Sequence, residues 1–142
     1  MWVDTHCHLD AAEFAGVEDD IAVGAAQSQV SMIVIPAVAR DNFVTVAELA
    51  RKHANCSYAL GIHPIYVPHA QESDLAVLRE TVAAAMNDTR FVAIGEIGLD
   101  FFVPMLTTPE MREKQEFFYS EQLKICLLYT SDAADDLLCV DL

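Results

Sequence analysis

Apolar residues along the chain alternate between short continuous runs and longer segments in which they recur every three or four residues. Continuous runs bounded by turn residues predict buried β-strands, and the wider spacing predicts amphipathic helices. Strands are predicted over residues 2–5, 32–38, 57–62 and 91–94. Helices are predicted over residues 17–29, 42–53, 74–86 and 110–125, and Ser73 and Asp74 are the expected cap of the third.

Four strand–helix pairs in this order are typical of an α/β protein with a parallel sheet and right-handed crossovers. Because the strands are continuous apolar runs, the sheet is expected to be covered on both faces. A flavodoxin-like sheet would give the same order, although no glycine-rich phosphate-binding loop follows any predicted strand. A complete eight-stranded α/β barrel needs roughly 250 residues, so 142 residues could hold only about half of one.

The last sixteen residues, 127–142, depart from this pattern. They hold four of the 22 acidic residues and none of the eight basic ones, so the net charge of −14 would be −10 without them. Their sequence resembles the translated adapter tail of a truncated open reading frame. We therefore expect residues 1–126 to form the folded unit and residues 127–142 to be a non-native tail. The alternative is an ordinary acidic C-terminal tail.

Charge and hydropathy narrow the classes of function. The excess of acidic residues argues against a nucleic-acid surface built on lysine and arginine, but bound metal could still bring an acidic protein to a phosphate. No apolar run approaches the ~20 residues of a membrane span, and the N-terminus has no secretory pattern. These features predict a cytoplasmic protein without membrane contact, and nothing in the sequence indicates a protein partner.

The strongest candidate for chemistry is the segment DTHCHLD at residues 4–10. His6 and His8 alternate along an extended backbone after the first predicted strand, so both imidazoles could point to the same side and bind one metal ion. The intervening Cys7 is expected to point away and to pack. Two histidines at this spacing also occur in surface loops without metal, so the position after a strand is what favours a site.

Two further polar residues also follow predicted strands. Glu96 lies in GEIGLD at residues 95–100, where a carboxylate is costly unless it is paired or bound to metal, and its flanking glycines would allow close backbone approach. A helix N-cap or a salt bridge is the alternative for Glu96. His63 lies in GIHP at residues 61–64 and could be a metal ligand, a donor to substrate or a residue that orients a ligand. In a barrel these residues would converge on one face.

The other two histidines are expected to lie outside this site. His53 ends a predicted helix, where a positive charge complements the helix dipole, so a structural role is expected. His69 lies in a polar loop and is expected to be exposed to solvent.

The segments DTHCHLD, GIHP and GEIGLD, in this order and at these intervals, resemble the TatD family of metal-dependent hydrolases. The helix containing EKQEFFYSEQLKI is similar to the helix after that family's fourth strand, and the resemblance covers residues 2–125. It implies the N-terminal half of a (β/α)8 TIM barrel of the amidohydrolase type. It also implies two divalent metal ions (Mg, Mn or Zn), with His6 and His8 on the first and Glu96 bridging both. Glu96 and His63 are the candidate catalytic residues.

The resemblance implies a phosphodiesterase or deoxyribonuclease that meets DNA through its metal ions. Two metals would clamp the phosphodiester, activate a water for in-line attack and stabilise the leaving oxygen. The family's remaining ligands are two histidines and an aspartate from later strands. They find no match after residue 125, so we expect this chain alone to be inactive. Two alternatives stay open: a hydrolase of a small-molecule amide or ester, and an inert half-barrel with exposed sheet edges.

Overall fold

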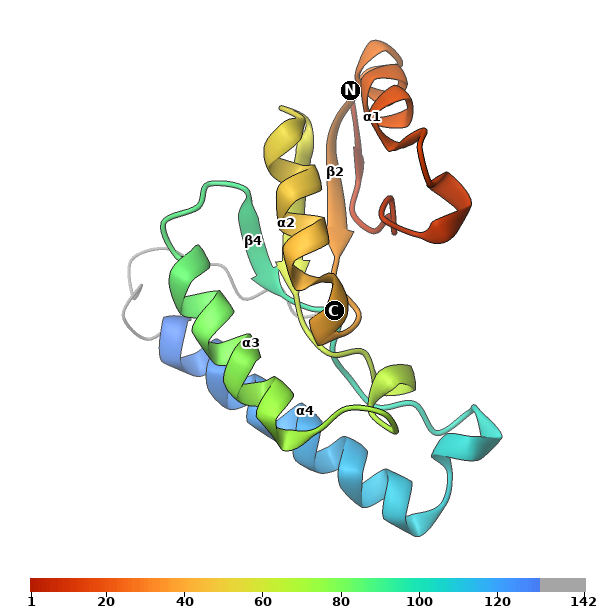
Figure 1. Cartoon of the computed structure of the whole chain (residues 1–142), viewed down its shortest axis with the longest axis vertical. Helices are drawn as coiled ribbons and strands as arrows, with labels where there is room; N and C mark the ends of the chain where they lie inside the picture. The colour runs from red at the N-terminus through yellow and green to blue at the C-terminus, as the bar shows by residue number, and fades with distance from the viewer. Residues whose placement is uncertain (131–142) are drawn as a thin grey trace.

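The computed structural model describes residues 1–130, so most of the expected tail lies outside the described residues. Four strands form one sheet: β1 (Trp2–Asp4), β2 (Val30–Pro36), β3 (Cys56–Leu60) and β4 (Phe91–Ile94). They alternate with four helices: α1 (Glu18–Gln27), α2 (Phe43–Lys52), α3 (Glu72–Ala85) and α4 (Pro109–Thr130) (Figure 1). The predicted α/β class and all eight elements are confirmed.

The strands are parallel and lie in the order β1-β2-β3-β4. Each crossover therefore steps to the next position in the same direction. A flavodoxin-like sheet has its first strand between the second and the third, so the observed order excludes that alternative. Sequential parallel strands are the arrangement found in an α/β barrel.

Most element boundaries differ from the prediction by one or two residues, and the start of α3 and the end of α4 need comment. The cap expected at Ser73 and Asp74 is wrong, because the helix begins earlier. Gln71 is the N-cap residue, and the Asp74 carboxylate accepts a hydrogen bond from the Gln71 N–H at 2.9 Å. A carboxylate at the third helical position is typical of a capping box. Helix α4 also continues to Thr130, beyond the expected end at residue 125.

The core lies between the sheet and the helices that cover it. Strand β3 is buried at every residue, and α2, α3 and α4 supply Phe43, Leu78 and Phe118 to the same cluster. Helices α3 and α4 lie side by side (Figure 1). The expectation of a sheet covered on both faces is wrong outside β3, because Trp2 of β1 is 72% exposed and no residue of β4 is buried. Among the described residues, β1 is hydrogen-bonded to a strand on one side only.

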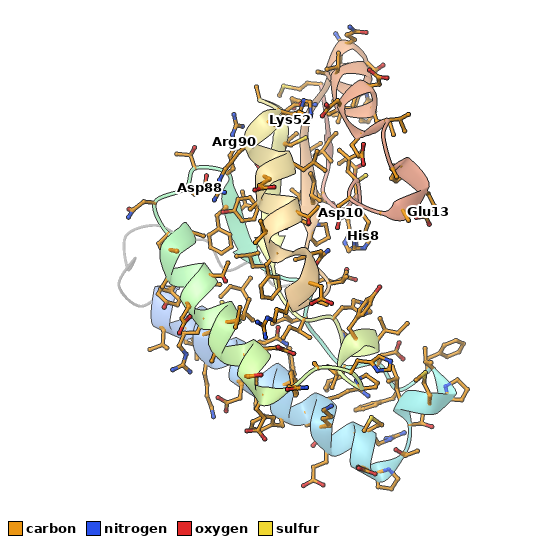
Figure 2. All side chains as sticks on the ribbon, viewed as in Figure 1. His8, Asp10, Glu13, Lys52, Asp88 and Arg90 are labelled. Atoms are coloured by element: carbon orange, nitrogen blue, oxygen red, sulfur yellow. The ribbon has the colours of Figure 1, made fainter. Side chains whose placement is uncertain are left out.

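Paired acidic and basic residues surround the starts of the strands, whereas a candidate metal-binding histidine follows the end of β1. Around the starts of the strands, Asp88 is paired with Arg51 at 2.7 Å, and the Arg90 guanidinium donates to the Ala54 carbonyl at 2.6 Å. His8 lies around the opposite ends, beyond the last residue of β1 (Figure 2). No helix within residues 1–130 is long and apolar enough to cross a membrane.

Candidate metal centre

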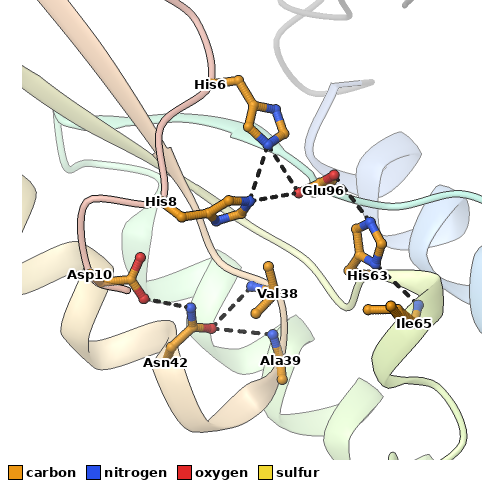
Figure 3. Close-up of polar contacts among 9 residues, drawn as sticks. All are labelled: His6, His8, Asp10, Val38, Ala39, Asn42, His63, Ile65 and Glu96. Carbon is orange, nitrogen blue, oxygen red and sulfur yellow. Dashed lines mark hydrogen bonds and ion pairs between the residues drawn. The ribbon is translucent and has the colours of Figure 1, made fainter. Parts of the chain in front are cut away.

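Three chain segments that follow strands meet at one edge of the sheet. His6 and His8 follow β1, His63 follows β3 and Glu96 follows β4 (Figure 3). Each segment is fixed by a backbone hydrogen bond to β2 or to the two residues that follow it. The Cys7, His63 and Glu96 N–H groups donate to carbonyls of residues 34, 38 and 37, at 3.0, 2.9 and 3.5 Å. The structure thus brings together the four side chains that the sequence singled out.

His6, His8 and Glu96 direct three donor atoms at one another. The two Nε2 atoms are 3.2 Å apart, and the Glu96 Oε2 atom lies 3.2 Å from His6 Nε2 and 3.4 Å from His8 Nε2 (Figure 3). The centre of such a triangle is about 1.9 Å from every corner, close to the ~2.0–2.2 Å bonds that Zn²⁺ makes to histidine and carboxylate. In the described part of the chain, this is the one group of three such residues that could hold a metal ion.

The burial of Glu96 Oε2 without a hydrogen-bond partner also favours a metal ion at this position. The atom is buried and has no hydrogen-bond partner, although both imidazoles approach it. A buried carboxylate oxygen is costly to leave unsatisfied. A cation held by Glu96 and the two histidines would compensate that charge, so the residues present fit a divalent metal.

His63 faces the other oxygen of the same carboxylate. Its Nε2 lies 3.1 Å from Glu96 Oε1, and its Nδ1 accepts a hydrogen bond from the Ile65 N–H at 3.1 Å. Because a backbone N–H can only donate, Nδ1 is the acceptor and the ring proton of the neutral imidazole lies on Nε2. A protonated Nε2 cannot bind metal. The geometry therefore favours a role in orienting Glu96 over the role of a ligand.

Cys7 lies between the two histidines but packs against the hydrophobic core, as expected from the sequence. Burial, and secondly the charges of Asp4 and Asp10, raise the pKa of the Cys7 thiol. The thiolate form that metals prefer is therefore disfavoured, which agrees with a packing role.

His53 and His69 lie away from the centre. His53, at the end of α2, lies 2.7 Å from the Asp19 carboxylate of α1, and Lys52 contacts the same carboxylate. Hydrogen bonds from Lys52 and then from His53 lower the pKa of Asp19. The contacts of Asp19 with Lys52 and His53 join α1 to α2, so His53 has a structural role. His69 is exposed to solvent, as expected.

Residues 3–130 match the family model of TatD related DNases. The chain belongs to the TatD family.

Several relatives in this family have curated names or solved structures. The metal-dependent hydrolase YjjV of Escherichia coli K12 is 36% identical over 128 residues, which cover 90% of this chain and 47% of YjjV. Human deoxyribonuclease TATDN3 is 29% identical over 87% of this chain and 47% of its own length. The crystal structure of YjjV superposes with a TM-score of 0.81 and 34% identity, over 91% of this chain and 48% of that one. The chain thus spans about half the length of the relatives it matches.

Two glycines, Gly61 and Gly95, meet beside this TatD-family site. A Cβ atom at Gly95, next to Glu96, would meet nothing within 4 Å. At Gly61, in contrast, a Cβ atom would lie 2.8 Å from the Gly95 backbone and 2.8 Å from the Ile97 side chain. The close approach expected beside Glu96 does occur at the Gly95 backbone, but the residue that must lack a side chain for it is Gly61. Gly61 follows β3 and lets the segment after β4 pass.

A cavity of about 480 Å³ adjoins the centre. Its wall includes His8, Glu96, His63 and two residues to which the sequence analysis assigned no role, Asp10 and Asn42. The Asn42 side-chain amide donates to Asp10 Oδ2 at 2.8 Å, and its oxygen accepts from two backbone N–H groups, of residues 38 and 39 (Figure 3). Asn42 precedes α2 but makes no side-chain cap to it. Its position in the sequence indicates only the start of a helix, so its bond to Asp10 could not be predicted.

Proposed function

We propose that the chain belongs to a divalent-metal-dependent phosphodiesterase that acts on DNA. The observation that carries the proposal is the triangle of His6 Nε2, His8 Nε2 and the buried, unpartnered Glu96 Oε2. The family description and the name of the human relative, a deoxyribonuclease, support DNA as the substrate.

Each residue of the centre has a separate task in this proposal. His6 and His8 would hold a first ion, and Glu96 would contribute its carboxylate to that ion and to a second. Mg, Mn and Zn are the candidate metals. When bound, such ions polarise phosphoryl oxygens and lower the pKa of a water molecule. His63 donates from Nε2 to Glu96 Oε1, which leaves Oε2 directed at the two imidazoles. Partners of this kind fix a ligand's orientation.

We also propose that the four β/α units form the first half of a (β/α)8 barrel. Their sequential order and their superposition on 48% of YjjV support this. The second metal would then take its remaining ligands, two histidines and an aspartate, from later strands, and this chain alone would not turn over substrate. A cytoplasmic location stays a prediction. A cooperative melt of a monomer that binds metal would refute the alternative of an inert half-barrel.

Metal binding by this chain is the first test. Calorimetric titration with Zn²⁺ and Mn²⁺ should show binding that Glu96→Gln weakens about 100-fold or more, since outer partners alone cost ~10–100-fold. Glu13→Gln is the matched control, because Glu13 lines the same cavity but is not one of the three clustered donors. Absence of binding, or an equal loss in both variants, would contradict the proposed site.

The substrate is tested separately, on the longer protein to which we propose this chain belongs. Metal-loaded enzyme should release nucleotides from DNA and lose that activity with a chelator. A panel of small-molecule esters and amides tests the alternative, because related barrels support such chemistry. Hydrolysis of that panel with DNA left intact would reject the phosphodiesterase and retain the metal site.

A further inference from the structure

Helix α4 carries two glutamines on the face that it buries. Residues 115, 118, 122 and 125 recur at helical spacing and form one stripe. Phe118 and Ile125 are apolar core residues, but Gln115 is 0% exposed and Gln122 is 1% exposed. A polar side chain in a buried stripe is unfavourable unless its hydrogen-bonding groups find partners. The partners of these two amides therefore indicate what they do.

Gln122 bonds both backbone polar groups of a single distant residue. Its Oε1 accepts from the Ile62 N–H at 2.7 Å, and its Nε2 donates to the Ile62 carbonyl at 3.1 Å. Strand β3 ends at Leu60, so the side-chain amide continues the pairing that a strand would give, two residues past the strand end. Ile62 is 1% exposed, so its backbone groups need partners inside the protein, and Gln122 supplies both.

Ile62 is the residue directly before His63. The next backbone N–H, that of His63, donates to the Val38 carbonyl at 2.9 Å, so the chain is held on both sides of this peptide bond. The imidazole then lies between the Ile65 N–H and Glu96 Oε1, at 3.1 Å from each. We propose that Gln122 is a positioning residue that fixes His63 against Glu96. The inference rests on the proposed metal centre, because Glu96 matters there as a ligand.

Gln115 uses the same chemistry on a different segment. Its Oε1 accepts from the Asp100 N–H at 2.7 Å, and its Nε2 donates to the Leu106 carbonyl at 3.0 Å. It thus fixes the loop that follows Glu96, without touching the backbone beside His63. Equal burial, equal hydrogen bonding and a different partner make Gln115 a matched control for Gln122.

The test uses the 142-residue chain and two readouts. Nitrogen-15 NMR of the imidazoles reports which ring nitrogen of His63 carries the proton, and calorimetry with Zn²⁺ reports metal affinity. In Gln122→Met, we expect loss of the single Nε2–H form of His63 and about five- to tenfold weaker Zn²⁺ binding, somewhat less than a direct partner of a ligand gives. Gln115→Met should keep the His63 form while losing a similar amount of thermal stability.

Three results would overturn the positioning role. The first is an unchanged His63 spectrum in Gln122→Met, and the second is the same spectral change in Gln115→Met. If Gln122→Met does not fold, Gln122→Glu decides when measured at a pH where its carboxylate is ionised, since it then keeps an acceptor for the Ile62 N–H but has no donor for the carbonyl. An unchanged His63 form in that variant is the third. Wild-type chain that binds no Zn²⁺ would reject the metal centre, and the metal-free His63 spectrum would still decide the role of Gln122.

Discussion

Glu96 uses its two carboxylate oxygens for different partners. Oε2 lies among the imidazoles of His6 and His8, and Oε1 lies 3.1 Å from His63 Nε2. This division leaves one oxygen beside the two imidazoles that could share a cation with it, and gives the other oxygen a ring nitrogen as partner. The sequence could predict that these residues converge, because each follows a strand. It could not predict the division, which depends on the turn at Pro64–Tyr66 bringing the Ile65 N–H to His63 Nδ1.

Two replacements of His63 test whether its hydrogen-bond donor matters: leucine has no donor, and glutamine has one. We expect His63→Leu to weaken Zn²⁺ binding by about tenfold or more, because Glu96 loses the partner that orients it. His63→Gln should recover part of the affinity, since its amide can donate to Oε1. Calorimetric titration measures both, and His69→Leu, at an exposed histidine, is the control. Wild-type affinity in His63→Leu would show that Glu96 needs no such partner.

At the scale of elements, local sequence patterns were sufficient to predict the order of strands and helices. They were not sufficient to predict the contacts between elements that are distant in the sequence. Periodicity depends on neighbours along the chain, which is why all eight elements could be predicted. The need for Gly61 depends on the segment after β4, more than 30 residues away, and the role of Gln122 depends on Ile62. Neither contact leaves a local signal, although a glutamine at a buried helical position could have raised the question.

Gly61→Ala tests the close packing of β3 against the segment after β4. The added methyl would lie 2.8 Å from the Gly95 carbonyl carbon, so the backbone must shift, and we expect a loss of about 1–3 kcal/mol in unfolding free energy. Zn²⁺ affinity should fall as well, because Glu96 moves with Gly95. Gly24→Ala is the control: its methyl meets nothing within 4 Å inside α1, and it should stabilise by about 0.5–1 kcal/mol. Urea unfolding measures both. Equal stabilities would contradict the predicted clash.

The cluster around Asp88 joins α2, β3 and the turn before β4, and it makes stability depend on pH. Burial acts to raise the pKa of Asp88, but hydrogen bonds from the Arg90 N–H, from Arg51 and from the Tyr58 hydroxyl outweigh it and lower that pKa. A lowered folded-state pKa adds stability above the unfolded value of about 3.9. That stability is lost as pH falls through the folded-state value.

We therefore expect Asp88→Asn to be less stable than wild type at pH 7 and to approach it below about pH 3.9, as the wild-type carboxylate becomes protonated. Urea midpoints measured from pH 7 down to acid unfolding provide the check. Asp41→Asn, at an exposed position, should differ little from wild type throughout. If the stability difference between Asp88→Asn and wild type were the same at every pH, the charge of Asp88 would not be the cause of the destabilisation.

At the scale of the whole molecule, positive charges are few, and four of them are paired with carboxylates of the described chain. The chain has eight basic residues and a net charge of −14. Seven of the eight make ion pairs or contacts to carbonyl groups: Arg40, Arg51, Lys52, Arg90, Arg112, Lys114 and Lys124. Among the described residues, no lysine or arginine lines the cavity beside the centre, so a phosphate that enters it meets neither side chain in its wall. If DNA binds here, the attraction must come from the ions at the centre.

This charge distribution predicts an unusual binding signature for DNA. Each phosphate neutralised by lysine or arginine adds ~0.9 to the slope of log affinity against log salt concentration, so a basic groove gives steep slopes. Here we expect a slope below about 2, together with loss of binding when EDTA removes the metal. Fluorescence anisotropy of a labelled oligonucleotide, titrated with Zn²⁺-loaded chain at several salt concentrations, measures both. Glu96→Gln should bind no better than the EDTA-treated chain, because it lacks the carboxylate that would hold the ion. A steep slope that survives EDTA would place DNA on a cationic surface outside the centre and would contradict recognition through metal.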